Sequence, residues 1–514
     1  MTAVSIESDP APAVEPPVAP GIQQDSPPRR ASWEVGHLAL AAVAIAILLL
    51  SVGPITDIDT YWHVLIGQEV LDSGRTGGLG NSWSLYVPGQ DWITSQWGSE
   101  VVMSATHQLF GWSGIVWLRT LLVLTLLAAL AVLLLKRASA STSAVVFALV
   151  LVPCLIVLQE RPLLASLIFL AWLSGVGYDL LTKGRQPRWF VVLPLVALWA
   201  NLHGMWVLAP ATFALVAITI AVDRNPAKSG RLRGALILTV VSILGGCLTS
   251  IGIKGLLLPF VFRSATPQIS EWQPVPLTSP QSFGLAAMFV TLVYLWARSP
   301  SRVPRSHIIY AIAWCAFGFT AYRNLLPAAI MMAPLAAASL SRTRLLHPRR
   351  PAPEQQKAIG VVTAITLIAG LAGLIAATAR VDPLAAAKPL AIAERLAKQP
   401  GETRVFNGYN TAGVLAAFGG DGIRLAIDGR SDRFGGDYIE RYVEAMSLGE
   451  GWQDLLRQVD PDAAVIDTSS ALAYELTKNQ GWTLVMTDGT YSLLTPPPNG
   501  PLREGSTSAP LSAS

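Results

Sequence analysis

The stretch GPITDIDTYWHVLIGQEVLDSG, residues 53–74, follows directly after the first long apolar run of the chain. It places two aspartates, Asp57 and Asp59, one residue apart, and it places His63 four residues after the second. Residues four apart lie on the same face of a helix, so Asp59 and His63 are expected to share a face. Asp57 would point away from Asp59 on a helix and can act beside it only from a preceding loop.

The same stretch predicts a short helix at a membrane surface. Thr56 or Asp57 can cap a helix that starts near Ile58, and Ser73-Gly74 provides its end. The apolar positions within it are compatible with a helix that lies along the bilayer surface. The alternative is that the two carboxylates only cap this helix and face water.

The composition identifies a membrane protein. The 514 residues are 52% hydrophobic and only 14% charged, whereas soluble domains carry about 25% charged residues. Long apolar runs recur, which indicates a polytopic α-helical membrane protein in contact with membrane lipids. The net charge of +4 is explained by short basic loops, and no basic and aromatic pattern indicates nucleic acid. Cys154, Cys247 and Cys315 all lie within apolar runs and are interpreted as buried small side chains.

Apolar windows of the length that spans a bilayer predict about eleven transmembrane helices. We place them near residues 37–55, 114–135, 141–158, 163–181, 189–201, 205–222, 234–250, 282–297, 307–321, 325–341 and 358–378.

Lysine and arginine concentrate in alternate loops, which sets the expected orientation. The N-terminus is expected to be cytoplasmic, in a multi-pass protein of the plasma membrane. Asp57 and the C-terminal region are then expected on the extracytoplasmic side.

Four parts of the chain are expected. They are a disordered cytoplasmic tail (1–34), a transmembrane domain (35–379) with a long outer loop (56–113), a small extracytoplasmic α/β domain (380–495) and a disordered tail (496–514). Within the α/β domain the pattern predicts strands at 403–410, 423–430 and 463–468, helices at 452–459 and 470–479, and a hairpin at 482–496 that turns at Asp488-Gly489.

Polar groups gather in the connections that are expected on the outer side. Ionisable groups at membrane depth are costly and are usually functional. An acidic pair, cationic side chains and tryptophans around one cavity fit an anionic, lipid-linked substrate that carries a sugar, because tryptophan faces stack on sugar rings and arginine binds phosphate. The candidate substrate-binding residues are Trp97, Glu100, Arg161, Asn201, His203 and Arg323.

An Asp-x-Asp motif just past the first span, in a long outer loop, resembles the layout of the GT-C glycosyltransferases. The segments TDIDTYWHVLIGQEVLDSG, WITSQWGSEVV, ANLHG, EWQP, YRNLLP and IDGR also look like a bacterial set of uncharacterised GT-C-like membrane proteins with a C-terminal soluble domain. The resemblance spans roughly residues 35–490.

The resemblance implies a cell-envelope transferase that inverts the sugar configuration and uses a polyprenyl-phosphate-linked donor. Asp57 or Asp59 would act as general base on an acceptor hydroxyl, or would help to hold a divalent cation, Mg²⁺ or Mn²⁺. The protein mannosyltransferase branch has Asp-Glu at this place, whereas this chain has Asp57-Ile58-Asp59. That departure leaves the acceptor and the need for a metal open, and the sugar is not indicated either.

Within this interpretation Asp59 is the preferred catalytic carboxylate, with Asp57 next and His63 tuning Asp59 or binding substrate. Arg323 and His203 are the first candidates to meet the phosphate, and Arg161 follows. Alternatives remain for two of these residues and for Glu100. Arg323 can simply end a span, His203 can close a helical break with Asn201, and Glu100 can belong to a solvated helix face.

The loop after the expected strand at 423–430 offers further candidates, Asp428, Arg430, Asp432 and Arg433, although a local salt-bridge turn would explain them equally. Two other classes of protein are kept as alternatives to the enzyme: a lipid or glycan transporter (flippase), and a non-catalytic membrane scaffold.

Overall fold

The computed structural model describes residues 33–85, 92–151, 158–223, 229–257, 270–300, 302–343, 351–498, 500 and 502. Most of the two expected tails lies outside these ranges, and so does Cys154.

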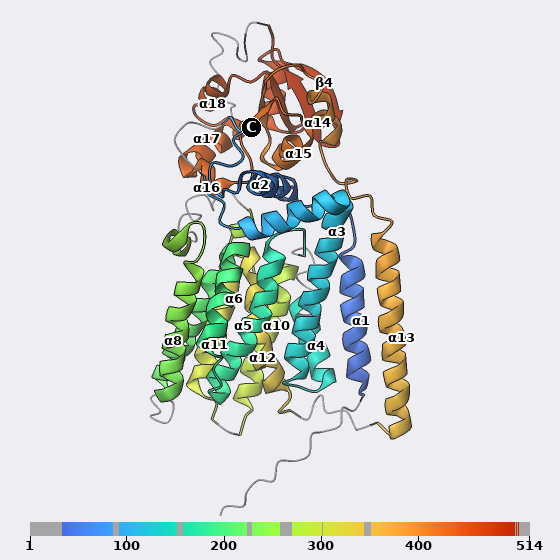
Figure 1. Cartoon of the computed structure of the whole chain (residues 1–514), viewed down its shortest axis with the longest axis vertical. Coiled ribbons are helices and arrows are strands. Elements are labelled where there is room, and N and C mark those ends of the chain that lie inside the picture. The colour runs from blue at the N-terminus through green and yellow to red at the C-terminus, as the bar shows by residue number, and fades with distance from the viewer. Residues whose placement is uncertain are drawn as a thin grey trace, which may run out of the picture.

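A helical bundle forms one half of the molecule (Figure 1). Every expected span contains a described helix. These helices are α1 (Val35–Leu50), α3 (Trp97–Leu135), α4 (Ala140–Leu151), α5 (Leu163–Lys183), α6 (Trp189–Leu202), α7 (Leu208–Val222), α8 (Ser229–Gly246), α10 (Phe283–Ala297), α11 (Arg305–Phe319), α12 (Leu325–Leu340) and α13 (Pro353–Thr378). Short 3₁₀ turns join several of them: η2 (Gly204–Val207), η4 (Gly252–Leu256), η6 (Ser270–Trp272), η7 (Pro280–Ser282) and η8 (Tyr322–Asn324).

Within the described part of the chain, six helical stretches are long and apolar enough to cross a membrane, judged by length and composition. They are Trp97–Leu135, Leu163–Lys183, Gly204–Val222, Pro280–Ala297, Tyr322–Leu340 and Pro353–Thr378, and α1, α4 and α6 are shorter apolar helices. The chain is therefore built as a multi-span bundle. The number of eleven spans and the orientation in the membrane remain predictions.

Helix α3 is broken at Gly111, whose φ of 61° lies in the left-handed region that favours glycine. The part before Gly111 runs across the end of the bundle beside α2 (Asp59–Ser73), and the part after it descends into the bundle (Figure 1). Helix α2 begins one residue later than expected and ends at Gly74, which has a φ of 65°.

A buried ion pair anchors the connection between α1 and α2 to the bundle. Arg119 of α3 contacts Glu160, and its guanidinium also donates to the carbonyl oxygens of Gly53 (2.6 Å) and Pro54 (3.3 Å). Both charged side chains are almost fully buried. The connection that leads into α2 is therefore anchored to α3 and, through Glu160, to the segment just before α5.

The C-terminal domain is an α/β domain whose five-stranded sheet has the order β2-β1-β3-β5-β4. Strands β1 (Thr403–Asn407), β2 (Ile423–Leu425) and β3 (Ala463–Asp467) are parallel, and β4 (Thr483–Asp488) and β5 (Tyr491–Thr495) add an antiparallel hairpin. Each predicted strand, the hairpin and the helices α18 (Trp452–Val459) and α19 (Ala471–Lys478) are present. Further elements were not predicted: α14 (Leu390–Leu396), η9 (Tyr409–Thr411), α15 (Ala412–Phe418), α16 (Ser431–Phe434) and α17 (Gly436–Ser447).

Helices cover both faces of this sheet, because neighbouring strand residues point to opposite sides. Val405 packs in the core that faces α14 and α15, whereas Phe406 packs in the core that faces α17, α18 and α19.

Helix α2 belongs to the first of these two cores. Tyr61, Trp62 and Val64 are buried with residues of the sheet and of α15. A Cβ atom built on Gly413 of α15 would lie only 2.0 Å from the carbonyl oxygen of Ile58, so the two segments touch through backbone. The sequence predicted a helix along the membrane surface and did not indicate that the C-terminal domain covers it. In the structure α2 lies between the bundle and the C-terminal domain (Figure 1).

The segment between α2 and α3 also joins the domain, by extending its sheet. Ser84 pairs with Leu425 of the edge strand β2 as a parallel bridge. The backbone N–H of Leu425 donates to Trp83 (2.7 Å), and that of Leu85 donates to Leu425 (2.9 Å).

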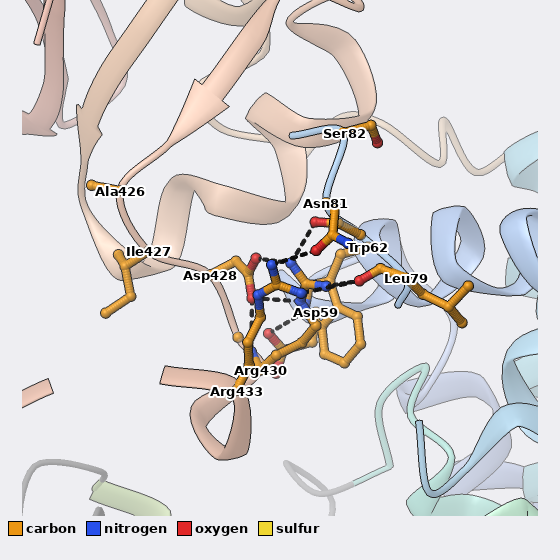
Figure 2. A network of polar contacts seen from close by, with 12 residues as sticks. Asp59, Trp62, Leu79, Asn81, Ser82, Ala426, Ile427, Asp428, Arg430 and Arg433 are labelled. Atoms are coloured by element: carbon orange, nitrogen blue, oxygen red, sulfur yellow. Dashed lines mark hydrogen bonds and ion pairs between the residues drawn. The ribbon is translucent and has the colours of Figure 1, made fainter. Parts of the chain in front are cut away.

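Arg430 fastens this segment to the domain (Figure 2). Its fully buried guanidinium holds Asp428 through two hydrogen bonds (2.9 and 2.5 Å) and donates to the carbonyl oxygens of Leu79 (2.9 Å) and Gly80 (3.0 Å). Arg433 adds bonds to Leu79 (3.1 Å) and to the side chain of Asn81 (2.6 Å). The salt-bridge turn that the sequence allowed is thus present, and it also clamps a distant loop.

Arg430→Lys tests this clamp. A lysine keeps the charge but cannot reproduce the fork of donors, so Asp428 and two carbonyl groups lose partners in a buried site. We expect a loss of ~3–5 kcal/mol in unfolding free energy, measured by denaturant titration in detergent. Arg404→Lys is the matched control, because Arg404 forms a partly exposed pair with Asp460 and should change stability by about 1 kcal/mol or less. Equal stability of the two variants would contradict the clamp.

Candidate functional site

A cavity of about 610 Å³ lies where the bundle, α2 and the C-terminal domain meet. Its size is in the range of small-molecule sites. The bundle contributes Gln159, Arg161, Pro162, Leu163, His203, Glu271, Trp272, Gln281, Tyr322, Arg323 and Leu325. Helix α2 and the segment before α3 contribute Asp59, Trp62, His63, Trp92, Thr94, Ser95 and Gln96, and the domain contributes Tyr409, Gly429, Arg430, Ser431 and Asp432.

Asp59 stands at the first turn of α2 with its carboxylate in this cavity. Its Oδ1 accepts a hydrogen bond from the indole of Trp62 at 2.9 Å. Burial raises the pKa of Asp59, and the negative charge of Asp57 raises it further, against the opposing effects of Arg161, His63 and Trp62. A carboxylate with a raised pKa in a cavity is suited to accept a proton.

Asp57 lies in the connection before α2 and is buried. One of its oxygens accepts from the backbone N–H of Asp59 (3.3 Å) and the other from Arg161 Nε (2.7 Å). Arg161 also binds Glu271 (2.6 Å) and stands 3.9 Å from Asp59. Asp57 therefore acts from the loop as a support, and the positive charge of Arg161 is shared among three carboxylates.

This arrangement does not fit a divalent ion between Asp57 and Asp59. The guanidinium of Arg161 already lies against both carboxylates, and the remaining oxygens accept N–H groups of the protein. Among the described residues, no group of three or more His, Cys, Asp or Glu side chains is placed to hold a metal ion.

His63 lines the cavity one turn after Asp59, as the spacing predicted. Its Nδ1 contacts Glu100 Oε1 at 3.1 Å, and its ring lies against that of Trp62 at a tilt of 38°, with centroids 3.7 Å apart. Glu100 is fully buried, and its second oxygen accepts from Thr94 at 2.7 Å. Glu100 therefore lies neither on a solvated face nor in the cavity wall. It supports the His63 ring through its contact with Nδ1.

His203 and Arg323 also reach the cavity. His203 Nδ1 accepts from the backbone N–H of Met205 (3.3 Å) and pairs with Ser166 Oγ (2.8 Å), so the ring also closes the break between α6 and η2. The guanidinium of Arg323 lies over the ring of Trp272, 4.2 Å from its centroid. Within the described part of the chain, Arg323 forms no ion pair with a carboxylate.

Two expected binding residues lie elsewhere. The indole of Trp97 donates to Asn201 Oδ1 at 2.7 Å, and the amide of Asn201 donates to the carbonyl oxygens of Ala197 and Leu248. Neither side chain lines the cavity. They join the start of α3 to the end of α6.

The C-terminal domain lines one wall of the cavity with Gly429 and Tyr409, which the sequence did not single out as candidates, and with Asp432, which it did. A Cβ atom on Gly429 would lie 2.2 Å from Asp59 Oδ1 and 2.6 Å from Trp62 Nε1, so only glycine fits against α2. Tyr409 and Asp432 line the same wall, and burial raises the pKa of both side chains. Their signal in the sequence was their place in polar loops that follow strands of the sheet.

A second, apolar pocket of about 230 Å³ adjoins the first. The two pockets share Arg161 and Pro162, and the second is lined mainly by side chains of α3 and α5, including Val102, Met103, Ile115, Leu118, Leu122 and Leu164.

The chain matches no protein-family model and no curated protein sequence. Its fold is similar to the oligosaccharyltransferase of Archaeoglobus fulgidus (12% identity, TM-score 0.48, covering 86% of this chain and 70% of that one). It is also similar to ArnT from Cupriavidus metallidurans bound to undecaprenyl phosphate (12%, 0.46, 90% and 97%), and to the arabinofuranosyltransferase AftD from Mycobacteria (17%, 0.48, 90% and 40%). These are GT-C glycosyltransferases, the class that the sequence resembles.

Gly429→Ala tests the contact between the domain and Asp59. The added methyl group must displace the Asp59 carboxylate and the Trp62 indole, so we expect a loss of ~1–3 kcal/mol in unfolding free energy. Gly408→Ala is the control, because its Cβ would meet its nearest neighbour at 3.7 Å, an ordinary contact. Denaturant titration followed by tryptophan fluorescence measures both variants. An unfolding free energy of Gly429→Ala equal to that of Gly408→Ala would contradict the close contact between Gly429 and Asp59.

Proposed function

We propose that the chain is a membrane glycosyltransferase that moves a sugar from a polyprenyl-phosphate-linked donor to a hydroxyl group of an acceptor at the extracytoplasmic face. The observation that carries this proposal is the pairing of the two pockets. A polar cavity lined by a carboxylate, an arginine and three tryptophans lies beside an apolar pocket at the end of the bundle.

The donor that fits this pairing has an apolar chain, a phosphate and a sugar in that order. The apolar pocket between α3 and α5 suits the first isoprene units of the chain. Arg323 suits the phosphate because it forms no direct ion pair with a carboxylate among the described residues, and Glu271 interacts with its charge only from further away. His203 supports it, since the bonds at Nδ1 leave the Nε2 atom for the cavity. The aromatic faces of Trp62, Trp92 and Trp272 suit the sugar.

Asp59 is the proposed general base. Its carboxylate takes the proton of the acceptor hydroxyl while the oxygen attacks the anomeric carbon and the bond to the lipid phosphate breaks. Arg161 holds the second carboxylate, Asp57, away from this role by pairing with it at 2.7 Å. Negative charge that develops on the leaving phosphate is met by Arg323.

Asp59→Asn should abolish transfer with the fold retained. Loss of a positioned general base costs about 10²- to 10⁴-fold in rate. The measurement is transfer of labelled sugar from a panel of prenyl-phosphate-linked sugars by the purified full chain in lipid vesicles. Asp72→Asn is the matched control, since Asp72 lies on the same helix but is exposed and bonds only to Gln68 among the described residues. Movement of the lipid-linked sugar across the vesicle without cleavage would indicate a transporter instead.

The pH dependence of transfer should report the environment of Asp59. Because the base must be ionised and its pKa is raised, activity should fall with acid at a pH above the ordinary aspartate range. Asp57→Asn removes a repelling charge and frees Arg161 to approach Asp59, and both effects lower the pKa of Asp59. The acid limb of the kcat/KM profile should therefore move to lower pH. A limb that stays in place would show that Asp59 is not the titrating group.

A further inference from the structure

The cavity holds two histidines whose buried partners make them chemically different. Each uses Nδ1 for a hydrogen bond within the protein, so Nε2 is the atom left for the cavity. What differs is the partner. His63 meets the carboxylate of Glu100, whereas His203 meets a backbone N–H and the hydroxyl of Ser166.

His203 is fixed as a neutral ring. The N–H of Met205 donates to its Nδ1, so that atom carries no hydrogen, and the hydroxyl of Ser166 must be the donor in its own bond to Nδ1. Nδ1 must accept both bonds and Nε2 carries the hydrogen. A proton added to this ring would fall on Nδ1 and break both bonds.

His63 can gain and lose a proton without breaking its buried bond. A carboxylate only accepts, so Nδ1 carries a hydrogen whether the ring is neutral or charged. Glu100 is itself fixed, with no exposed surface and with Thr94 on its second oxygen. The other titratable groups that interact with this ring are Asp59 on the same helix and His203, which precedes the turn η2. Nε2 of His63 is therefore free to exchange a proton with the cavity.

We propose that His63, held by Glu100, is the general acid of the transfer and donates its Nε2 proton to the leaving lipid phosphate. This proposal rests on the proposed function. The acceptor oxygen bonds to the anomeric carbon as its proton passes to Asp59. The bond from that carbon to the phosphate oxygen breaks, its electron pair stays on the phosphate, and the phosphate takes the proton from His63. The proton on Asp59 then passes to His63, one turn further along α2, and restores both groups.

In this scheme Glu100 is a positioning residue. It never touches the substrate, but its carboxylate accepts the hydrogen of His63 Nδ1 at 3.1 Å, which fixes the tautomer and the orientation of the ring. The net result of a cycle is the movement of one proton from the acceptor hydroxyl to the lipid phosphate.

Binding of farnesyl phosphate, a short analogue of the leaving group, tests the assignment without turnover. Affinity is measured for the purified full chain by tryptophan fluorescence from about pH 5.5 to about pH 8.5, the range in which an imidazole titrates. At the acidic end His63→Gln should bind about tenfold more weakly than the wild type, because one charge-assisted hydrogen bond is lost. At the basic end the two proteins should converge.

Two further variants separate this role from a structural one. Glu100→Gln should reproduce the acid-side loss with His63 still present, and Glu100→Asp should restore part of it. His107→Gln is the matched control, because His107 lies on α3 against Trp112 and outside the cavity. Its affinity should equal that of the wild type at every pH.

The possible failures are distinct. Equal affinities of His63→Gln and wild type across the pH range would overturn the role of His63 and leave the transferase intact. A wild-type protein that binds no farnesyl phosphate would overturn the proposed function and this inference together.

Discussion

The backbone of Gly429 lies directly against the carboxylate of Asp59, and the shape of the cavity depends on this contact. There is no room for a side chain at Gly429. The next residue, Arg430, is buried and bonded both to its own domain and to the segment that follows α2. The domain therefore cannot shift over Asp59 without breaking the hydrogen bonds from this buried guanidinium to the carbonyl oxygens of Leu79 and Gly80, which would leave buried polar groups unpaired. The bundle, α2 and the C-terminal domain, which together line the cavity, are therefore packed as one unit.

The second constraint is the pairing of buried charge. Charges removed from water must be matched by partners. Arg161 meets this need for the buried Asp57, stands near Asp59 and also pairs with the partly exposed Glu271. Glu100 is satisfied by His63 and Thr94. The remaining cavity-lining cation of the bundle, Arg323, rests on an aromatic face rather than on a carboxylate among the described residues. The charge that remains available in the cavity thus depends on which carboxylates already pair with a cation or a hydrogen-bond donor of the protein.

Much of this could be predicted because it depends on neighbours along the chain. The limits of α2, the common face of Asp59 and His63, the loop position of Asp57 and the hairpin at Asp488 follow from caps, helical spacing and turn residues. Other features depend on segments that are far apart in sequence. The burial of α2 beneath the domain, the bond between Glu100 and His63, and the pairing of Trp97 with Asn201 each need a partner that no local pattern names.

The sequence by itself determined the apolar helices, the acidic start of α2 and the alternating pattern of the C-terminal domain, because periodicity and composition act over a few residues. Only the tertiary structure decided which carboxylate stays in the cavity, which is neutralised and which supports a histidine. The physical reason is that the charge state and reach of each group are set by desolvation and by the groups packed against it. Those groups come from the bundle, from α2 and from the domain at once.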